Sequence, residues 1–237
     1  MKASKVGAAS GARREHRTLA IDIGGTGLKA SVLDAQGNML VDRVSVPTPY
    51  PCRPAVLLRA LAGLVAPLPA FDRISIGFPG VVRGGRVVTA PHFGTDHWRG
   101  YALEATLARR FGKPVRLLND AEVQGLGIIG GKGLEVVLTL GTGVGSAVFV
   151  DGQLTPHLEL AHHPIHKGMT YNEYIGNAAR HALSAKKWNR RVLKTIGIVE
   201  ALLNYDVLHI GGGNAANLTA DLPDNVRIAS NDAGLTG

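Results

Sequence analysis

The stretch LAIDIGGTGLKASVLD, residues 19–34, places three glycines and a threonine between two hydrophobic runs, just after Asp22. Its glycine spacing fits neither the P-loop nor the dinucleotide fingerprint, and both motifs need a helix after the glycines. Here residues 28–33 are apolar and β-branched, and a turn-rich cluster follows at residues 34–38. The stretch therefore predicts a β-hairpin with a glycine bend, then a turn and a third strand over residues 39–46.

The glycine bend of this hairpin has two interpretations. Glycine lets the backbone turn its N–H groups into a concave anion nest, because no side chain stands in the way. A plain hairpin turn has the same composition, so this stretch alone leaves both interpretations open.

A second stretch, VVLTLGTGVGSAVFVDGQL at residues 136–154, matches the first when the sequence is shifted by 117 residues. Asp22 then falls on Thr139 and Gly24 on Gly141, and apolar positions coincide. Similarity at about half the chain length predicts two lobes built on one plan. Two such bends would face a shared cleft and grip the two ends of a phosphate chain.

The other hydrophobic patterns predict an α/β order. Strands are predicted at residues 73–78, 115–118 and 206–210, and helical stretches at residues 100–111, 121–129 and 171–203. Asn119 and Asp120 head the middle helix, and both residue types are suited to cap it. They also follow the carboxyl end of a strand, where open α/β sheets bind their ligands.

The composition is that of a globular protein. Apolar residues make up 45% of the 237 residues, and no run of about 18 of them occurs to span a membrane. The single cysteine, Cys52, excludes an internal disulfide and fits a reducing cytoplasm. Residues 1–17 lack the apolar core of a signal peptide. We predict that they form a disordered basic tail, which supplies +4 of the net charge of +8.

Two clusters of charged or titratable residues have plain alternatives. A basic cluster on the predicted helix 171–203 indicates either a solvated face or a polyanion track. Its members are Arg180, Lys186, Lys187, Arg190, Arg191 and Lys194. Four histidines surround Glu159 without the spacing of a zinc motif, so we predict no metal site formed by them. These are His157, His162, His163 and His166.

Six motifs follow one another along the chain: DIGGTGLK (22–29), GFPG (77–80), LLND (117–120), LTLGTGVGSAVFVDG (138–152), ELAH (159–162) and HIGGG (209–213). Over residues 18–236 they resemble the ROK family (repressors, open reading frames and kinases) of the actin-like ATPase and sugar-kinase superfamily. Within it they are most similar to polyphosphate glucokinases. The resemblance implies an α/β, two-lobed actin-like ATPase (ribonuclease H-like) fold with a central cleft. We place the small lobe at residues 18–118 and the large lobe at residues 119–237.

The resemblance also implies roles for residues in the cleft. Asp120 is the expected catalytic base, and Asp22 is expected to help organise Mg²⁺, the expected cofactor. The residues expected to contact sugar hydroxyls are Pro79, Gly80, Asn119, Asp120, Glu159 and His162. Those expected to bind donor phosphates are Asp22, Gly24, Gly25, Thr26, Gly27, Lys29, Gly141, Thr142 and Gly143. The triplet Gly211, Gly212 and Gly213 would lie against a nucleotide base.

These roles describe a cytoplasmic sugar kinase that phosphorylates the 6-hydroxyl of glucose from polyphosphate, ATP or both. Phosphoryl transfer depends on positioning and charge stabilisation, which two backbone nests, Mg²⁺ and a carboxylate base would supply. The alternatives are an ATP-dependent ROK kinase for another hexose such as mannose, and a sugar-binding ROK protein that does not react. We expect a homodimer with no membrane partner and no nucleic-acid partner.

Three departures from the family pattern bear on these expectations. Ala161 replaces the glycine of the family's Glu-x-Gly-His element, so the family pattern does not predict the backbone conformation of the sugar loop. The cysteine-rich zinc motif of many ROK kinases is missing, as it is in polyphosphate glucokinases. The chain stops at NDAGLTG, which predicts a looser hinge. A DNA-binding repressor would need about 60–80 residues of helix-turn-helix before the first strand, and we expect none.

Overall fold

The predicted hairpin lies at the centre of the first sheet. In the computed structural model, which describes residues 16–229, β1 (Thr18–Ile23) pairs antiparallel with β2 (Gly27–Leu33). The N–H of Gly24 donates to the carbonyl of Gly27 at 2.9 Å and closes the bend. The hairpin prediction is confirmed, whereas most of the predicted basic tail lies outside the described residues.

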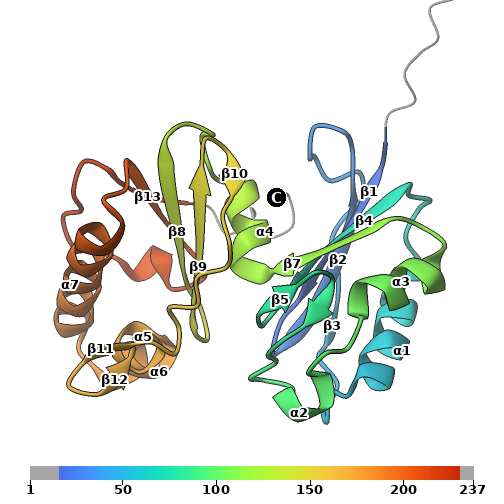
Figure 1. The fold of residues 1–237 in the computed structure, drawn as a ribbon, viewed down its shortest axis with the longest axis horizontal. Coiled ribbons are helices and arrows are strands. Elements are labelled where there is room, and N and C mark those ends of the chain that lie inside the picture. The colour runs from blue at the N-terminus through green and yellow to red at the C-terminus, as the bar shows by residue number, and fades with distance from the viewer. Residues whose placement is uncertain (1–15, 230–237) are drawn as a thin grey trace, which may run out of the picture.

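The first sheet has the order β3-β2-β1-β4-β7. β4 (Arg73–Phe78) is parallel to β1, and β7 (Val115–Asn119) is parallel to β4. Helices α1 (Pro54–Val65) and α3 (Leu103–Phe111) lie on the outer side of this sheet (Figure 1). Their apolar sides share one buried core with the strands and with Trp98.

The third predicted strand is shorter than expected. β3 covers Val44–Pro47, and Met39 forms an isolated bridge with Leu33. The Ser31 hydroxyl donates to the carbonyl of Val41 at 2.8 Å. This side-chain bond takes up a backbone acceptor just before the strand and competes with regular pairing.

The second predicted hairpin lies at the centre of a second sheet with the order β10-β9-β8-β13-β14. β8 (Leu134–Leu140) and β9 (Val144–Val150) are antiparallel, and β10 (Gln153–Leu154) continues from β9. β13 (Val207–Gly211) is parallel to β8 and to β14 (Val226–Ile228). Both glycine stretches therefore form hairpins, as predicted.

The register of the second hairpin corrects the predicted repeat. Leu140 pairs with Val144, whereas the equivalent pair in the first hairpin is Ile23 with Leu28. The second bend is therefore one residue shorter. The first strands are related by a shift of 117 residues and the second strands by 116. With this correction, the burial patterns of the two second strands coincide from Leu28 and Val144 onwards.

The helical stretch predicted over residues 171–203 consists of three helices. They are α5 (Tyr171–Ile175), α6 (Asn177–Ala182) and α7 (Ala185–Leu203). Extended backbone at Gly176 separates the first two, and the Ser184 side chain caps α7 by accepting the N–H of Lys187. Helix α7 lies on the outer side of the second sheet (Figure 1) and contributes Trp188 to its core.

Short elements fill the connections between these strands and helices. They are β5 (Val82–Arg83), β6 (Arg86–Val87), α2 (Thr95–Trp98), β11 (Pro164–His166), β12 (Met169–Thr170) and a 3-10 turn (Ala215–Asn217). Within residues 16–229, no helix has the length and apolar character to cross a membrane.

Helix α4 (Asp120–Leu126) lies between the two sheets (Figure 1). It begins directly after β7, with Asn119 as its N-cap and Glu122 completing a capping box. It ends before the predicted residue 129, because the N–H of Gly127 turns back to the carbonyl of Gln124. On β9, the Phe149 ring lies so close that a methyl group at Gly125 would stand 2.6 Å from it.

We expect Gly125→Ala to lower the free energy of unfolding by about 1–3 kcal/mol, because the added methyl group overpacks the contact with Phe149. Gly63→Ala in α1 is the matched control, since a methyl group there meets nothing within 4 Å. It should stabilise the protein by about 0.5–1 kcal/mol. Chemical denaturation measures both values, and equal effects would contradict the close packing of α4 on β9.

Candidate active site

A cleft of about 580 Å³ opens between the two sheets. Both glycine bends and the first turn of α4 line it. The predicted site residues in its wall are Asp22, Gly24, Gly25, Thr26, Lys29, Pro79, Gly80, Asn119, Asp120, Gly141, Thr142, Gly143, Glu159, His162, Gly212 and Gly213. Gly27 and Gly211 lie instead in strands beside the cleft, where they pair with Pro47 and Thr139.

The first glycine bend is held by its carbonyl groups. The Thr48 hydroxyl donates to the carbonyl of Gly24 and the Tyr50 hydroxyl to that of Gly25, both at 2.6 Å. The Thr48 N–H donates to the carbonyl of Thr26 at 3.2 Å. These bonds engage the carbonyl groups of three consecutive residues of the bend, and an anion nest uses backbone N–H groups rather than carbonyl groups.

The second glycine bend is held in a different way. The N–H of Gly141 donates to the carbonyl of Gly143, and the N–H of Val144 donates to the Asn172 side chain at 2.6 Å. A methyl group at Gly145 would stand 2.8 Å from Ala121. Glycine at this position therefore lets the second hairpin approach the start of α4 closely.

Asp120 lines the cleft together with residues of both bends. Burial raises the pKa of its carboxyl group to about 7, and the charges of Asp22 and Glu159 add to the effect. Its carboxylate accepts the N–H of Ala121 at 2.9 Å. A carboxyl group with a pKa near neutrality is suited to take up a proton from a reacting hydroxyl.

Asp22 stands opposite Asp120 with a cationic partner. The Lys29 ammonium donates to its carboxylate at 2.9 Å. Among the described residues, no three His, Cys, Asp or Glu side chains converge as metal ligands. Mg²⁺ is commonly held by one or two carboxylates together with substrate phosphates, and Asp22 could supply such a carboxylate. The residues present therefore fit this ion better than zinc.

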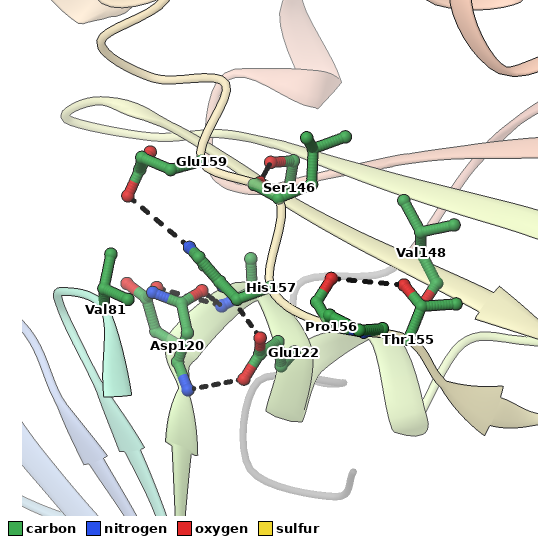
Figure 2. A network of polar contacts seen from close by, with 12 residues as sticks. Val81, Asp120, Glu122, Ser146, Val148, Thr155, Pro156, His157 and Glu159 are labelled. Carbon is green, nitrogen blue, oxygen red and sulfur yellow. Dashed lines mark hydrogen bonds and ion pairs between the residues drawn. The ribbon is translucent and has the colours of Figure 1, made fainter. Parts of the chain in front are cut away.

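His157 forms a contact that the sequence did not reveal. Its Nδ1 lies 2.8 Å from the Glu122 carboxylate, and its Nε2 lies 3.6 Å from that of Glu159 (Figure 2). The hydrogen bond to Glu122, together with the negative charge of Glu159, raises the pKa of the imidazole to about 9. His157 is therefore an imidazolium between two glutamates.

Several other cleft residues were also missed from the sequence. Arg43, His92, Gln124, Thr139, Ser146 and Asn172 line the wall together with His157. Thr139 could have been found from the sequence, because it aligns with the site residue Asp22 in the internal repeat. No sequence pattern pointed to Asn172, since its contact with the second bend spans 28 residues of sequence.

The departure at Ala161 has a simple structural outcome. Ala161 is buried, its N–H donates to the Glu159 carboxylate at 3.0 Å, and its carbonyl accepts the N–H of Asn172. Its backbone is not in the left-handed region that favours glycine. Alanine therefore fits this loop without strain.

The basic cluster divides into two groups. Arg191 lies over the Tyr174 ring at 4.6 Å and Arg180 over the Trp188 ring at 5.6 Å, so these two guanidinium groups pack within the lobe. The exposed members are Lys186, Lys187, Arg190 and Lys194. The cleft wall described here contains none of the six.

The family assignment follows from sequence comparison. The pattern of the ROK family matches residues 18–166. The chain belongs to the ROK family. Its two-lobed α/β architecture is the actin-like ATPase fold of ROK sugar kinases.

Individual ROK relatives extend this assignment. A polyphosphate glucokinase of Mycobacterium leprae is 32% identical over 86% of this chain, which spans 65% of that protein. A polyphosphate glucokinase of Mycobacterium tuberculosis is 31% identical over 86% of this chain and 80% of its own length. The solved inorganic polyphosphate/ATP-glucomannokinase of Arthrobacter sp. strain KM has a TM-score of 0.83 and 32% identity. That match covers 93% of this chain and 96% of the other.

The raised pKa of Asp120 predicts a pH-dependent cost in stability. The folded state holds the Asp120 proton more tightly than the unfolded state, so ionisation between about pH 4 and pH 7 lowers the free energy of unfolding. Asp120→Asn removes this cost. The variant should match wild type near pH 4 and exceed it by on the order of 3 kcal/mol at pH 8.

Urea denaturation from pH 4 to pH 8 measures this difference. Asp42→Asn, at an exposed position of the first lobe, is the matched control and should show no such trend. A difference between Asp120→Asn and wild type that is constant with pH would contradict the buried carboxyl group.

Proposed function

We propose that this chain is a cytoplasmic sugar kinase that transfers a phosphoryl group from polyphosphate, ATP or both to the 6-hydroxyl of glucose. The observation that carries the proposal is the position of Asp120. Its carboxyl group has a pKa near neutrality and lines a cleft that both glycine bends also line. The names of the mycobacterial and Arthrobacter relatives support the same substrates.

Asp120 would act as the general base. As the 6-hydroxyl oxygen forms a bond to the terminal phosphorus of the donor, the bond from that phosphorus to its bridging oxygen breaks, the donor leaves one phosphate shorter, and the carboxylate accepts the hydroxyl proton. Asn119 supports this geometry from the preceding position. Its side-chain amide donates to the carbonyl of Gly80 at 3.1 Å and ties the Pro79-Gly80 turn to the start of α4. Glu159 and His162 would bind the remaining sugar hydroxyls from the second lobe.

The glycine bends would hold the donor phosphates. The backbone amides of Gly25–Thr26 and of Thr142–Gly143 would approach the phosphate chain from the two bends, and the Lys29 ammonium adds positive charge. Asp22 would hold Mg²⁺, which neutralises negative charge on the donor phosphates when it is bound. Gly212 and Gly213 line the same cleft as the glycine bends and would receive the base of ATP.

A second substrate has specific support. The Arthrobacter protein is a glucomannokinase, so mannose is the second hexose that we propose for this cleft. A non-reacting sugar-binding protein is the weaker alternative, because a candidate base, Asp120, and both glycine bends line the same cleft. The homodimer stays a prediction.

A product-forming assay tests the function. Purified protein with Mg²⁺ should form glucose 6-phosphate from polyphosphate. Parallel reactions replace polyphosphate by ATP, or glucose by mannose. Product from ATP with none from polyphosphate would contradict the polyphosphate part.

Asp120→Asn should lower turnover by about 10²- to 10⁴-fold, because the variant lacks the base. Calorimetry should still detect glucose binding, and Asp42→Asn should keep wild-type turnover. An active Asp120→Asn variant would contradict the mechanism.

A further inference from the structure

His157 connects two parts of the cleft that are distant in sequence. Glu122 belongs to α4, 35 residues before His157, and Glu159 belongs to the loop after β10. The imidazole lies between their carboxylates, with one ring nitrogen directed at each (Figure 2). Its side chain is 10% exposed, so little water reaches the two contacts.

The Glu122 side of this contact is fixed by the helix. One Glu122 oxygen faces His157 Nδ1 at 2.8 Å, and the other accepts the backbone N–H of Asn119 at 2.9 Å. Glu122 therefore has both of its oxygens engaged and is 6% exposed. His157 is thereby held against the first turn of α4, next to Asp120.

The Glu159 side is held less firmly. One Glu159 oxygen accepts the N–H of Ala161 at 3.0 Å, and the other faces His157 Nε2 at 3.6 Å. His157 Nε2 is buried and has no hydrogen-bond partner among the described residues. Glu159 is 34% exposed and lines the cleft. Its carboxylate is thus oriented by one backbone N–H and by the charge of one imidazolium.

The charges around Glu159 also favour an imidazolium at position 157. Two glutamates near a third carboxyl group, Asp120, would repel one another in a partly buried site. An imidazolium between them offsets this repulsion. A neutral residue at position 157 would leave Glu159 free to turn towards water.

We propose that His157 is a positioning residue that holds the Glu159 carboxylate in the cleft, ready to accept hydrogen bonds from the sugar. The inference rests on the proposed function, since it assumes that Glu159 binds sugar. His157 acts through Glu159 and does not touch the phosphate donor. Its loss should therefore weaken sugar binding and leave binding of the phosphate chain unchanged.

A double-mutant cycle on glucose binding tests this role. Calorimetry without donor would compare wild type, His157→Gln, Glu159→Gln and the double variant. Each single variant should bind glucose about tenfold more weakly, and the double variant no more weakly than Glu159→Gln alone. Tripolyphosphate binding should stay at the wild-type value in all four. His163→Gln, an exposed histidine in the same segment, is the matched control.

The possible failures of this cycle are distinguishable. Independent effects, in which the double variant loses the product of the two single losses, would overturn the positioning role. An unchanged glucose affinity in Glu159→Gln would overturn the sugar assignment itself. Equal losses of glucose and tripolyphosphate binding in His157→Gln would show a general structural role instead.

A measurement on the wild-type protein covers the case in which His157→Gln does not fold. The ring resonances of His157 should show a doubly protonated imidazole at pH 7. They should shift when glucose saturates the cleft and stay unchanged with tripolyphosphate. A His157 ring that does not respond to glucose would overturn the proposal.

Discussion

The arrangement of the cleft depends on how the first turn of α4 is fixed between the two sheets. Asn119 and Glu122 cap the helix reciprocally, and the Asn119 amide also ties the helix start to the Gly80 carbonyl. Gly125 and Gly145 let the second hairpin approach the same helix. Asp120 is thereby placed where α4 packs against β4 of the first sheet and near the second hairpin, and its burial there raises its pKa.

The carbonyl groups of the two glycine bends are bound by different partners. An anion nest needs amide groups that face the ligand, so the carbonyl groups of the same bend need other partners. In the first lobe, Thr48 and Tyr50 supply those partners. In the second lobe the bend is one residue shorter, and the Asn214 side-chain amide donates to the carbonyl of Gly141 at 3.2 Å, while Asn172 accepts the N–H of Val144. The lobes thus share a plan without sharing the contacts that stabilise it.

Local patterns in the sequence predicted the hairpins, the three further strands at residues 73–78, 115–118 and 206–210, and the position of Asp120 at the end of a strand. Such local patterns could not predict contacts between segments that are distant in the sequence. An ungapped comparison could not show that the second bend lacks one residue, because the strands around it keep the same apolar alternation. The contacts of His157 with Glu122 and Glu159 depend on how the loop after β10 folds back on α4. In the sequence, His157 stood out merely as one of four neighbouring histidines.

The central claim is that one carboxylate and two backbone nests meet on a single sugar and phosphate chain. A crystal structure with glucose and a non-transferable ATP analogue tests it most directly. The account predicts the glucose 6-hydroxyl within about 2.6–3.2 Å of the Asp120 carboxylate. It also predicts that the phosphate oxygens contact amides of both bends. A 6-hydroxyl turned away from Asp120, or phosphates held by one bend alone, would contradict it.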